Sequence, residues 1–316
     1  MKKYLLLLLF ISQFGFSATI TNIPPPNFKH YLMDFDDCDA CGCSASGGGM
    51  GFSSMLDKNF VGVRYFNQSY SSRDGIFKNS PWIDENFNTV QLWARIPVFK
   101  NFQISALVPY HFHNRELSTG RQTIEGLGDI TVLGLYTVYQ TKKDSTVFTH
   151  MLQAGAGVKA PTGKYNSAAS TGSVNPSFQV GTGSWDYLLA AEYVIKKQDL
   201  GFNAMLNYAF KTENDQHYQF GNQLNYAGTF FYVVEREKFT LVPQVGLAGE
   251  TYATNKQYGE DIPDTKGDIL FSKVGLEAGS GKFSVGLNAM LPISQNLTGG
   301  RVEANYRWSV NLNYSL

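Results

Sequence analysis

The last sixteen residues of the chain, RVEANYRWSVNLNYSL, alternate between polar and apolar side chains without exception. Arg301 and every second residue after it are polar or charged, whereas Val302 and every second residue after it are apolar or aromatic. A period of two is the geometry of a β-strand whose two faces meet different surroundings. The run is longer than the strands of small soluble sheets, so the apolar face is predicted to meet either a large core or lipid.

The beginning of the chain narrows this choice. Lys2 and Lys3 precede a largely apolar run that is too short to span a bilayer as a helix. This pattern predicts a signal peptide over residues 1–17, cut after Ser17, and an exported mature chain. No later stretch reaches about 18 apolar residues, so strands are the elements expected to cross a membrane.

Composition excludes one class of partner and is compatible with a barrel. The chain has 26 basic and 26 acidic residues, so it lacks the excess of positive charge that is typical of proteins that bind nucleic acid. Its slightly polar mean hydropathy is expected of strands that turn one face to lipid and the other to a wet lumen.

The same period-two pattern predicts about twelve strands. They are expected at residues 59–71, 86–98, 102–114, 127–140, 146–160, 183–196, 200–211, 221–234, 238–252, 266–278, 281–293 and 301–316. The connections between them alternate between short and long. This alternation predicts an all-β fold, a closed antiparallel transmembrane β-barrel over residues 59–316 with short periplasmic turns, longer external loops and both termini in the periplasm. A soluble β-sandwich or a large exported barrel is the alternative.

In the predicted register, charged and polar side chains of both signs line the lumen. They are Arg64, Arg95, His111, His113, Lys159, Asp186, Glu192, Glu250, Lys273, Glu277, Arg301, Glu303 and Arg307. A channel selective for one ionic charge would carry an excess of one sign. Salt bridges that brace the wall are therefore an equally good account of these residues.

The pair His111 and His113 places two imidazoles on one face of a strand. A hydrolase would also need a nucleophile and an orienting acid, and the sequence holds no G-x-S-x-G motif. We therefore predict polar lumen residues, no catalytic residues and no enzyme activity. A weak metal site is the remaining possibility for the pair.

A different kind of segment, residues 18–58, separates the signal from the first strand. It holds Cys38, Cys41 and Cys43 among several aspartates, and C-x2-C-x-C spacing could bind Cu(I) or Zn(II). Export to an oxidising compartment also allows a disulfide with one thiol left over. The following glycine run is predicted to be a flexible linker or part of a plug in the lumen.

Three motifs carry a resemblance to a known family. KAPTGKY (159–165), PSFQVGTGSWDY (176–187) and GDITVLGLY (128–136) resemble motifs of bacterial outer-membrane proteins named for a MetA pathway of phenol degradation. The resemblance implies a barrel associated with transport of aromatic or other small hydrophobic molecules. No catalytic residues carry over, and the cysteine segment lies outside the resemblance.

The leading hypothesis is an outer-membrane channel or transporter for small molecules, hydrophobic or aromatic ones among them, with selectivity set by the 161–182 loop and the lumen lining. Its expected partners are outer-membrane lipid and a small solute, without nucleic acid. The alternative is a barrel that binds Cu or Zn at Cys38, Cys41 and Cys43 for metal export or sensing. An outer-membrane hydrolase is a third, weaker reading.

Overall fold

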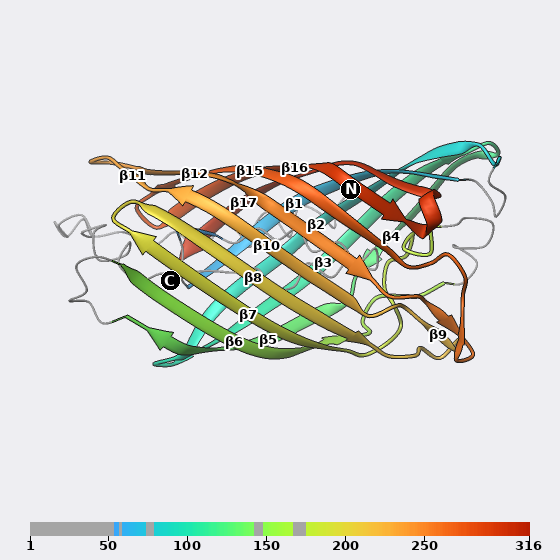
Figure 1. Cartoon of the computed structure of the whole chain (residues 1–316), viewed down its shortest axis with the longest axis horizontal. Helices are drawn as coiled ribbons and strands as arrows, with labels where there is room; N and C mark the ends of the chain where they lie inside the picture. Colours follow the sequence, from blue (N-terminus) through green and yellow to red (C-terminus); the bar gives the residue numbers. More distant parts are fainter. Residues whose placement is uncertain (1–53, 57–58, 74–78, 142–147, 167–174) are drawn as a thin grey trace, which may run out of the picture.

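The computed structural model describes residues 54–56, 59–73, 79–141, 148–166 and 175–316. Twelve long antiparallel strands form a closed barrel (Figure 1). Their bounds are β1 Phe60–Arg73, β2 Trp82–Phe99, β3 Phe102–Leu117, β5 Ile130–Gln140, β6 Thr149–Ala160, β7 Asp186–Lys197, β8 Leu200–Lys211, β10 Gln223–Tyr232, β12 Thr240–Tyr252, β15 Gly267–Ser280, β16 Phe283–Leu297 and β17 Val302–Ser315.

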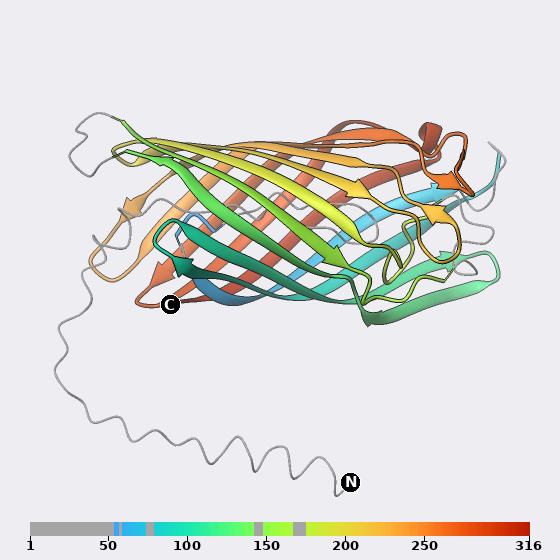
Figure 2. The ribbon, with the colours of Figure 1, turned by 90° about the horizontal axis from the view of Figure 1, so that it is seen from below.

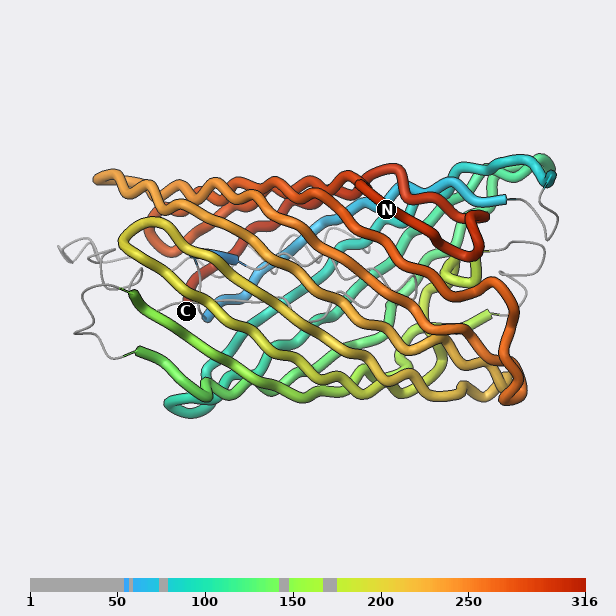
Figure 3. The backbone as a smooth tube through the Cα atoms, in the orientation of Figure 1, coloured from blue at the N-terminus to red at the C-terminus, as the bar shows by residue number. Residues whose placement is uncertain are grey.

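Two pairings close the sheet. β1 pairs with β17, and β10 pairs with β12, so none of these twelve described strands is left as a free edge. Closure satisfies the backbone N–H and C=O groups that lipid could not satisfy. The predicted closed antiparallel barrel is therefore confirmed, and its strands run at a steep tilt to the barrel axis (Figure 3).

The connections divide the barrel into two ends. The end that holds the brief connections β2–β3, β7–β8 and β15–β16 is called the short-turn end here, and the opposite end is the long-loop end (Figure 2). Leu316 N–H donates to the carbonyl of Asn59 over 3.0 Å, so both limits of the barrel lie at the short-turn end.

Some stretches predicted as loops at the long-loop end are strands instead. β3 continues to Leu117 and pairs with β4 (Gly120–Leu127), which extends this hairpin beyond its neighbours. β9 (Tyr218–Gln219), β13 (Lys256–Gln257) and β14 (Glu260–Asp261) form a small separate sheet. A short 3-10 turn, η1 (Thr298–Gly300), joins β16 to β17 at the long-loop end. At the opposite end, β11 (Val234–Glu235) pairs with the start of β12.

The outer and inner faces of the wall have opposite chemistry. Apolar side chains such as Leu92, Val245 and Val274 point outward and are more than half exposed. Exposed aromatics also gather near the two ends, for example Trp185 and Tyr187 at the long-loop end and Phe99 and Phe283 at the short-turn end. This is the pattern of two interfacial aromatic bands around an apolar belt. Within the described residues, no helix is long and apolar enough to cross a membrane.

Candidate functional site

The residues predicted to line the lumen, apart from Arg301 and Glu303, lie on the buried inner face of the wall. Each is at most 2% exposed. They are Arg64, Arg95, His111, His113, Lys159, Asp186, Glu192, Glu250, Lys273, Glu277 and Arg307. Some of their contacts join strands that are not neighbours, such as Arg307 with Glu250 and Lys273 with Thr229, so these side chains brace the wall from within the lumen.

Two predicted lumen residues lie elsewhere. Arg301 precedes β17, is half-buried, and its Nη2 lies 4.0 Å from Asp264 Oδ2. The predicted lumen position of Glu303 is wrong. Its side chain is exposed, whereas Val302 and Ala304 on either side are buried. The cause is a bulge, because Asn305 is an extra residue that β1 leaves unpaired in the described sheet. One extra residue exchanges the two faces of a strand, so the predicted alternation holds only from the bulge onward, where Arg307 points inward.

Two lysines and two aspartates form a buried cluster near the long-loop end. Lys159 Nζ lies 3.0 Å from Asp129 Oδ2 and 2.6 Å from Asp186 Oδ2. Lys211 Nζ lies 2.9 Å from the same oxygen of Asp186. The four charges sum to zero and are almost fully buried, which is the condition under which buried ions are tolerated.

Asp129 also holds the connection between β6 and β7. The described parts of this connection, 161–166 and 175–185, are called the lumen loop here. Asp129 accepts hydrogen bonds from Gly163 N–H at 2.9 Å, Thr182 N–H at 2.9 Å and Thr182 Oγ1 at 2.7 Å. The three sequence motifs, GDI, KAPTG and GTGS, therefore converge on one carboxylate.

Glycine is required where the two halves of the lumen loop meet. A Cβ placed on Gly181 would lie 2.4 Å from the carbonyl carbon of Gly163, and one on Gly163 would lie 2.8 Å from Gly181 Cα. Both approaches are to backbone, which cannot move aside like a side chain. The glycines of the two motifs thus allow close backbone contact at this point.

The far part of the lumen loop reaches β2, three strand positions from β6. Asn175 Nδ2 donates to Glu85 Oε2 on β2 over 2.5 Å, and Glu85 Oε1 lies 3.5 Å from Arg115 Nη1. Phe178 is fully buried, with the Arg115 guanidinium 4.3 Å from its ring centroid and the Phe87 ring at 5.9 Å. Since β5 and β3 lie between β6 and β2, the loop spans part of the lumen and narrows it.

A second ion pair bridges strands that are not neighbours. Arg307 on β17 contacts Glu250 on β12 through two bonds, Nη1 to Oε1 at 2.6 Å and Nη2 to Oε2 at 2.9 Å. β15 and β16 separate these strands, so the pair bridges part of the lumen. Tyr70 and Tyr252 hydroxyls complete the network, Tyr70 with Arg307 and Tyr252 with Glu250.

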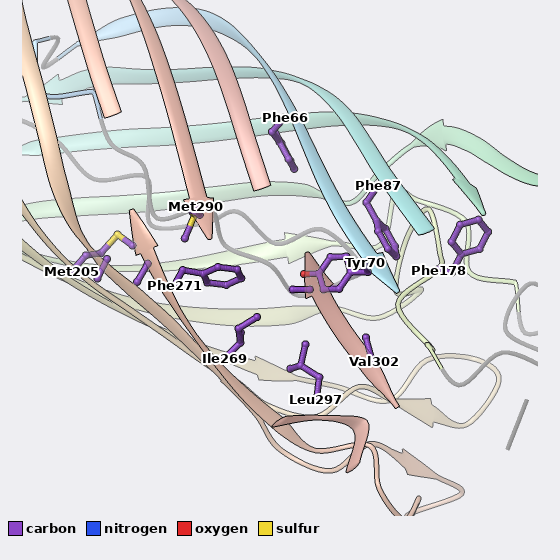
Figure 4. Packing of buried hydrophobic residues seen from close by; sticks show 13 residues of the cluster. Phe66, Tyr70, Phe87, Phe178, Met205, Ile269, Phe271, Met290, Leu297 and Val302 are labelled. Atoms are coloured by element: carbon purple, nitrogen blue, oxygen red, sulfur yellow. The ribbon is translucent and has the colours of Figure 1, made fainter. Parts of the chain in front are cut away.

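Apolar side chains also fill part of the lumen. Figure 4 shows a cluster contributed by several strands and by the lumen loop. Its labelled members are Phe66, Tyr70, Phe87, Phe178, Met205, Ile269, Phe271, Met290, Leu297 and Val302. The outer face of the barrel is already apolar, so insertion in lipid does not require these inward-facing apolar side chains. They make part of the lumen lining hydrophobic.

A pocket lies between the lumen loop and the wall at the long-loop end. It has about 670 Å³ of empty volume, part of it open to solvent. Its lining is Tyr70, Asn175, Pro176, Ser177, Lys211, Phe220, Gly221, Gln223, Tyr252, Asn255, Thr265, Lys266, Gly267, Leu297, Thr298 and Val302. Gln223 is 1% exposed, and no described residue donates a hydrogen bond to its Oε1 atom. The pocket, called the mouth pocket here, therefore combines aromatic faces with a buried polar acceptor.

Among the described residues, the histidine pair is held by hydrogen bonds and ring packing. The rings of His111 and His113 are 4.8 Å apart, and each Nδ1 is engaged, one with Thr89 Oγ1 at 2.8 Å and the other with Asn88 N–H at 3.1 Å. His111 Nε2 packs against the backbone of Gly128. Within the described part of the chain, no group of three His, Cys, Asp or Glu side chains could hold a metal ion.

The predicted signal peptide, residues 1–17, and Cys38, Cys41 and Cys43 lie outside the described residues. Metal binding at these cysteines stays a prediction.

Sequence reasoning missed several residues of the lumen site. The GDI motif could have identified Asp129. Glu85, Arg115, Lys211 and Gln223 lie within or next to strands whose alternation is ordinary. Only their partners in space distinguish them from other inward polar residues.

Comparison with solved structures gives the same fold. An outer membrane channel from Pseudomonas putida F1 matches with a TM-score of 0.61 and 16% identity, covering 81% of this chain and 94% of that chain. The β domain of the Bordetella autotransporter Brka matches with a TM-score of 0.48 and 9% identity, over 82% of this chain and 99% of the other. The second match is too distant to carry an argument. None of the curated proteins matches the chain.

The closed wall, the apolar outer face and the polar inner face define an outer-membrane type of β-barrel. The family described as "Putative MetA-pathway of phenol degradation" matches residues 87–313. The chain belongs to this family, and the match includes all three motifs that meet at Asp129.

Proposed function

We propose that this protein is a channel of the bacterial outer membrane that passes small apolar or aromatic molecules. In this proposal the long-loop end faces outward, and both termini face the periplasm. The apolar cluster inside the lumen is the observation that carries the proposal, because a path for ions or sugars alone would be lined by polar groups.

Location in the outer membrane is supported by the exposed apolar belt and its two aromatic bands. The pattern of the first residues, typical of a signal peptide, agrees with export. The similar barrel from P. putida F1 is itself an outer membrane channel. Membrane lipid is then the partner of the outer face, and a small solute is the partner of the inner face.

The lumen loop is proposed to set the size limit of the solute. Its two halves are held by Asp129, and its far part is held by Glu85 through Asn175. A loop fixed at both places cannot swing aside without breaking buried polar contacts, so it acts as a rigid constriction.

The mouth pocket is proposed to receive the solute before it reaches the constriction. Tyr70, Phe220 and Tyr252 offer aromatic surface, and Gln223 Oε1 offers a buried acceptor. A planar ring with one O–H or N–H donor would satisfy both kinds of contact.

We further propose that the protein is not an enzyme. The lumen charges are used in pairs and in loop anchoring, and the imidazoles of His111 and His113 pack against aromatic and backbone groups.

The test is uptake by intact Gram-negative cells that express the protein or carry the empty vector. N-phenylnaphthylamine, an apolar dye excluded by an intact outer membrane, should enter faster when the protein is present, whereas a neutral disaccharide should not. Faster entry of the disaccharide without faster entry of the dye would refute the proposed solute class.

A further inference from the structure

Residues 54–56 lie inside the lumen. Ser54 is fully buried and Met55 is 9% exposed, although they precede the first strand. The Met55 N–H donates to Glu277 Oε2 on β15 over 2.7 Å. A backbone donor bonded to a buried carboxylate makes a strong, charge-assisted hydrogen bond.

The side chain of Met55 belongs to an apolar cluster at the short-turn end. The other members come from β6, β7, β10 and β12 and from the residue between β10 and β11. They are Met151, Val194, Phe231, Val233 and Val242. Leu56 packs against this cluster, and its Cδ1 atom lies 2.9 Å from the position that a Cβ on Gly279 would occupy. This set of contacts is called the arm seat here.

The arm seat extends over a large part of the wall. Going around the barrel, β6 is followed by β7, β8, β10, β12 and β15. The apolar cluster starts at β6, and the hydrogen bond of Met55 ends on β15, five strand positions away in a closed ring of twelve. Strands separated in this way lie on nearly opposite sides of a barrel, so residues 54–56 and their partners cross the lumen.

We propose that residues 54–56, called the arm here, form a plug that closes the short-turn end of the channel. This inference rests on the proposed channel function, since closure has meaning only for a path. It adds a regulatory site: any periplasmic event that withdraws the arm from Glu277 would open the lumen at this end.

A simpler account treats the same contacts as the route by which the chain joins β1. That account predicts a buried Met55 as well, but it predicts no change in permeation when the seat is broken. Seating and closure therefore need separate measurements.

Seating is tested by a disulfide in the full-length protein with Cys38, Cys41 and Cys43 replaced by Ser. Leu56→Cys and Gly279→Cys should form a disulfide on mild oxidation of the folded barrel, detected by mass spectrometry. The control pairs Leu56→Cys with Leu92→Cys, whose native side chain is exposed on the outer face, and should stay reduced. A reduced Leu56/Gly279 pair, or equal oxidation of both pairs, would overturn the seat.

Closure is tested by single-channel conductance in a planar bilayer. Met55→Asp places a charge in the apolar cluster beside the Glu277 carboxylate and should release the arm, with roughly a twofold or larger rise in conductance. Met55→Leu is the matched control and should behave like the wild type, because it keeps an apolar side chain of similar size.

The outcomes separate the two proposals. Unchanged conductance of Met55→Asp, including no conductance in any form, overturns closure by the arm. If Met55→Asp conducts more but neither it nor the wild type admits N-phenylnaphthylamine, the plug stands and the proposed solute class fails.

Discussion

The buried lysine and aspartate cluster gives the most quantitative prediction. Lys159 sits between Asp129 and Asp186, and Lys211 balances the second carboxylate. Lys159→Met keeps most of the side-chain volume but leaves two carboxylates with one cation. Removing one partner of a buried ion pair costs about 3–5 kcal/mol, and we expect a loss of unfolding free energy in this range.

Asp129→Asn should also destabilise the barrel, because it leaves an excess positive charge and weakens the acceptor for the lumen loop. The double variant Lys159→Met/Asp129→Asn restores charge balance, with the Lys211–Asp186 pair intact at 2.9 Å. Its loss of stability should therefore be smaller than the sum of the two single losses by about 1–3 kcal/mol.

The assay is chemical unfolding of the barrel in lipid vesicles, followed by tryptophan fluorescence. Arg121→Met is the control, since the Arg121–Glu116 pair is well exposed at 3.4 Å and should contribute at most about 1 kcal/mol. Additive losses in the double variant, or a loss for Arg121→Met equal to that for Lys159→Met, would refute the electrostatic reasoning.

Three further variants examine the lumen loop and the mouth pocket. Gly181→Ala should destabilise the barrel by about 1–3 kcal/mol and expose the loop to limited proteolysis, because its Cβ meets the backbone of Gly163; wild-type protection would contradict this. Asn175→Ala removes the bond to Glu85 and should let larger apolar dyes enter cells, with the size limit measured by a dye series; an unchanged limit would show that this contact does not fix the constriction. Gln223→Leu should reduce uptake of hydroxylated rings relative to unsubstituted ones, and an unaltered ratio would exclude Gln223 as the polar contact.

The strands and the closure of the barrel could be predicted because the same alternation of polar and apolar residues is repeated along the chain. Alternation identifies each strand, and the wall must close because lipid satisfies no backbone group. Four prolines inside the strands lie at irregular places, because proline has no N–H to donate to the ladder. Register shifts occur beside Pro97 and Pro292, the neighbour of β3 changes at Pro109, and Pro243 lies between the partners β10 and β11.

The lumen position predicted for Glu303 is wrong because of a local irregularity that the alternating sequence pattern does not reveal. The sequence pattern continues through the bulge at Asn305, while the side chains exchange faces there. Val302 and Ala304 can occupy the lumen because the lumen near them is itself apolar, beside Leu297 and Tyr70. The rule that polar side chains point into the lumen is therefore unreliable wherever the inner surface is also apolar.

The roles of the paired charges could not be predicted because their partners come from distant strands. Arg307 and Glu250 are 57 residues apart, and Asn175 and Glu85 are 90 apart. Their sequence neighbourhoods show only a polar residue on an inward face. The family motifs were more informative, since all three contribute to the Asp129 contacts, but their sequences do not show that they share one carboxylate.

Charge balance explains how apolar clusters and ions can share one lumen. Among the buried residues that the structure describes, seven are basic and six are acidic, and ion pairs join Lys159, Lys211, Arg115 and Arg307 to carboxylates. Paired charges hold the wall and the lumen loop in place without giving the lumen a large excess of one sign. The apolar surfaces between them are then free to determine what passes. In this arrangement the ion pairs fix the shape of the path, the aromatic and aliphatic side chains set its chemistry, and the arm seat at the short-turn end is placed to control access to it.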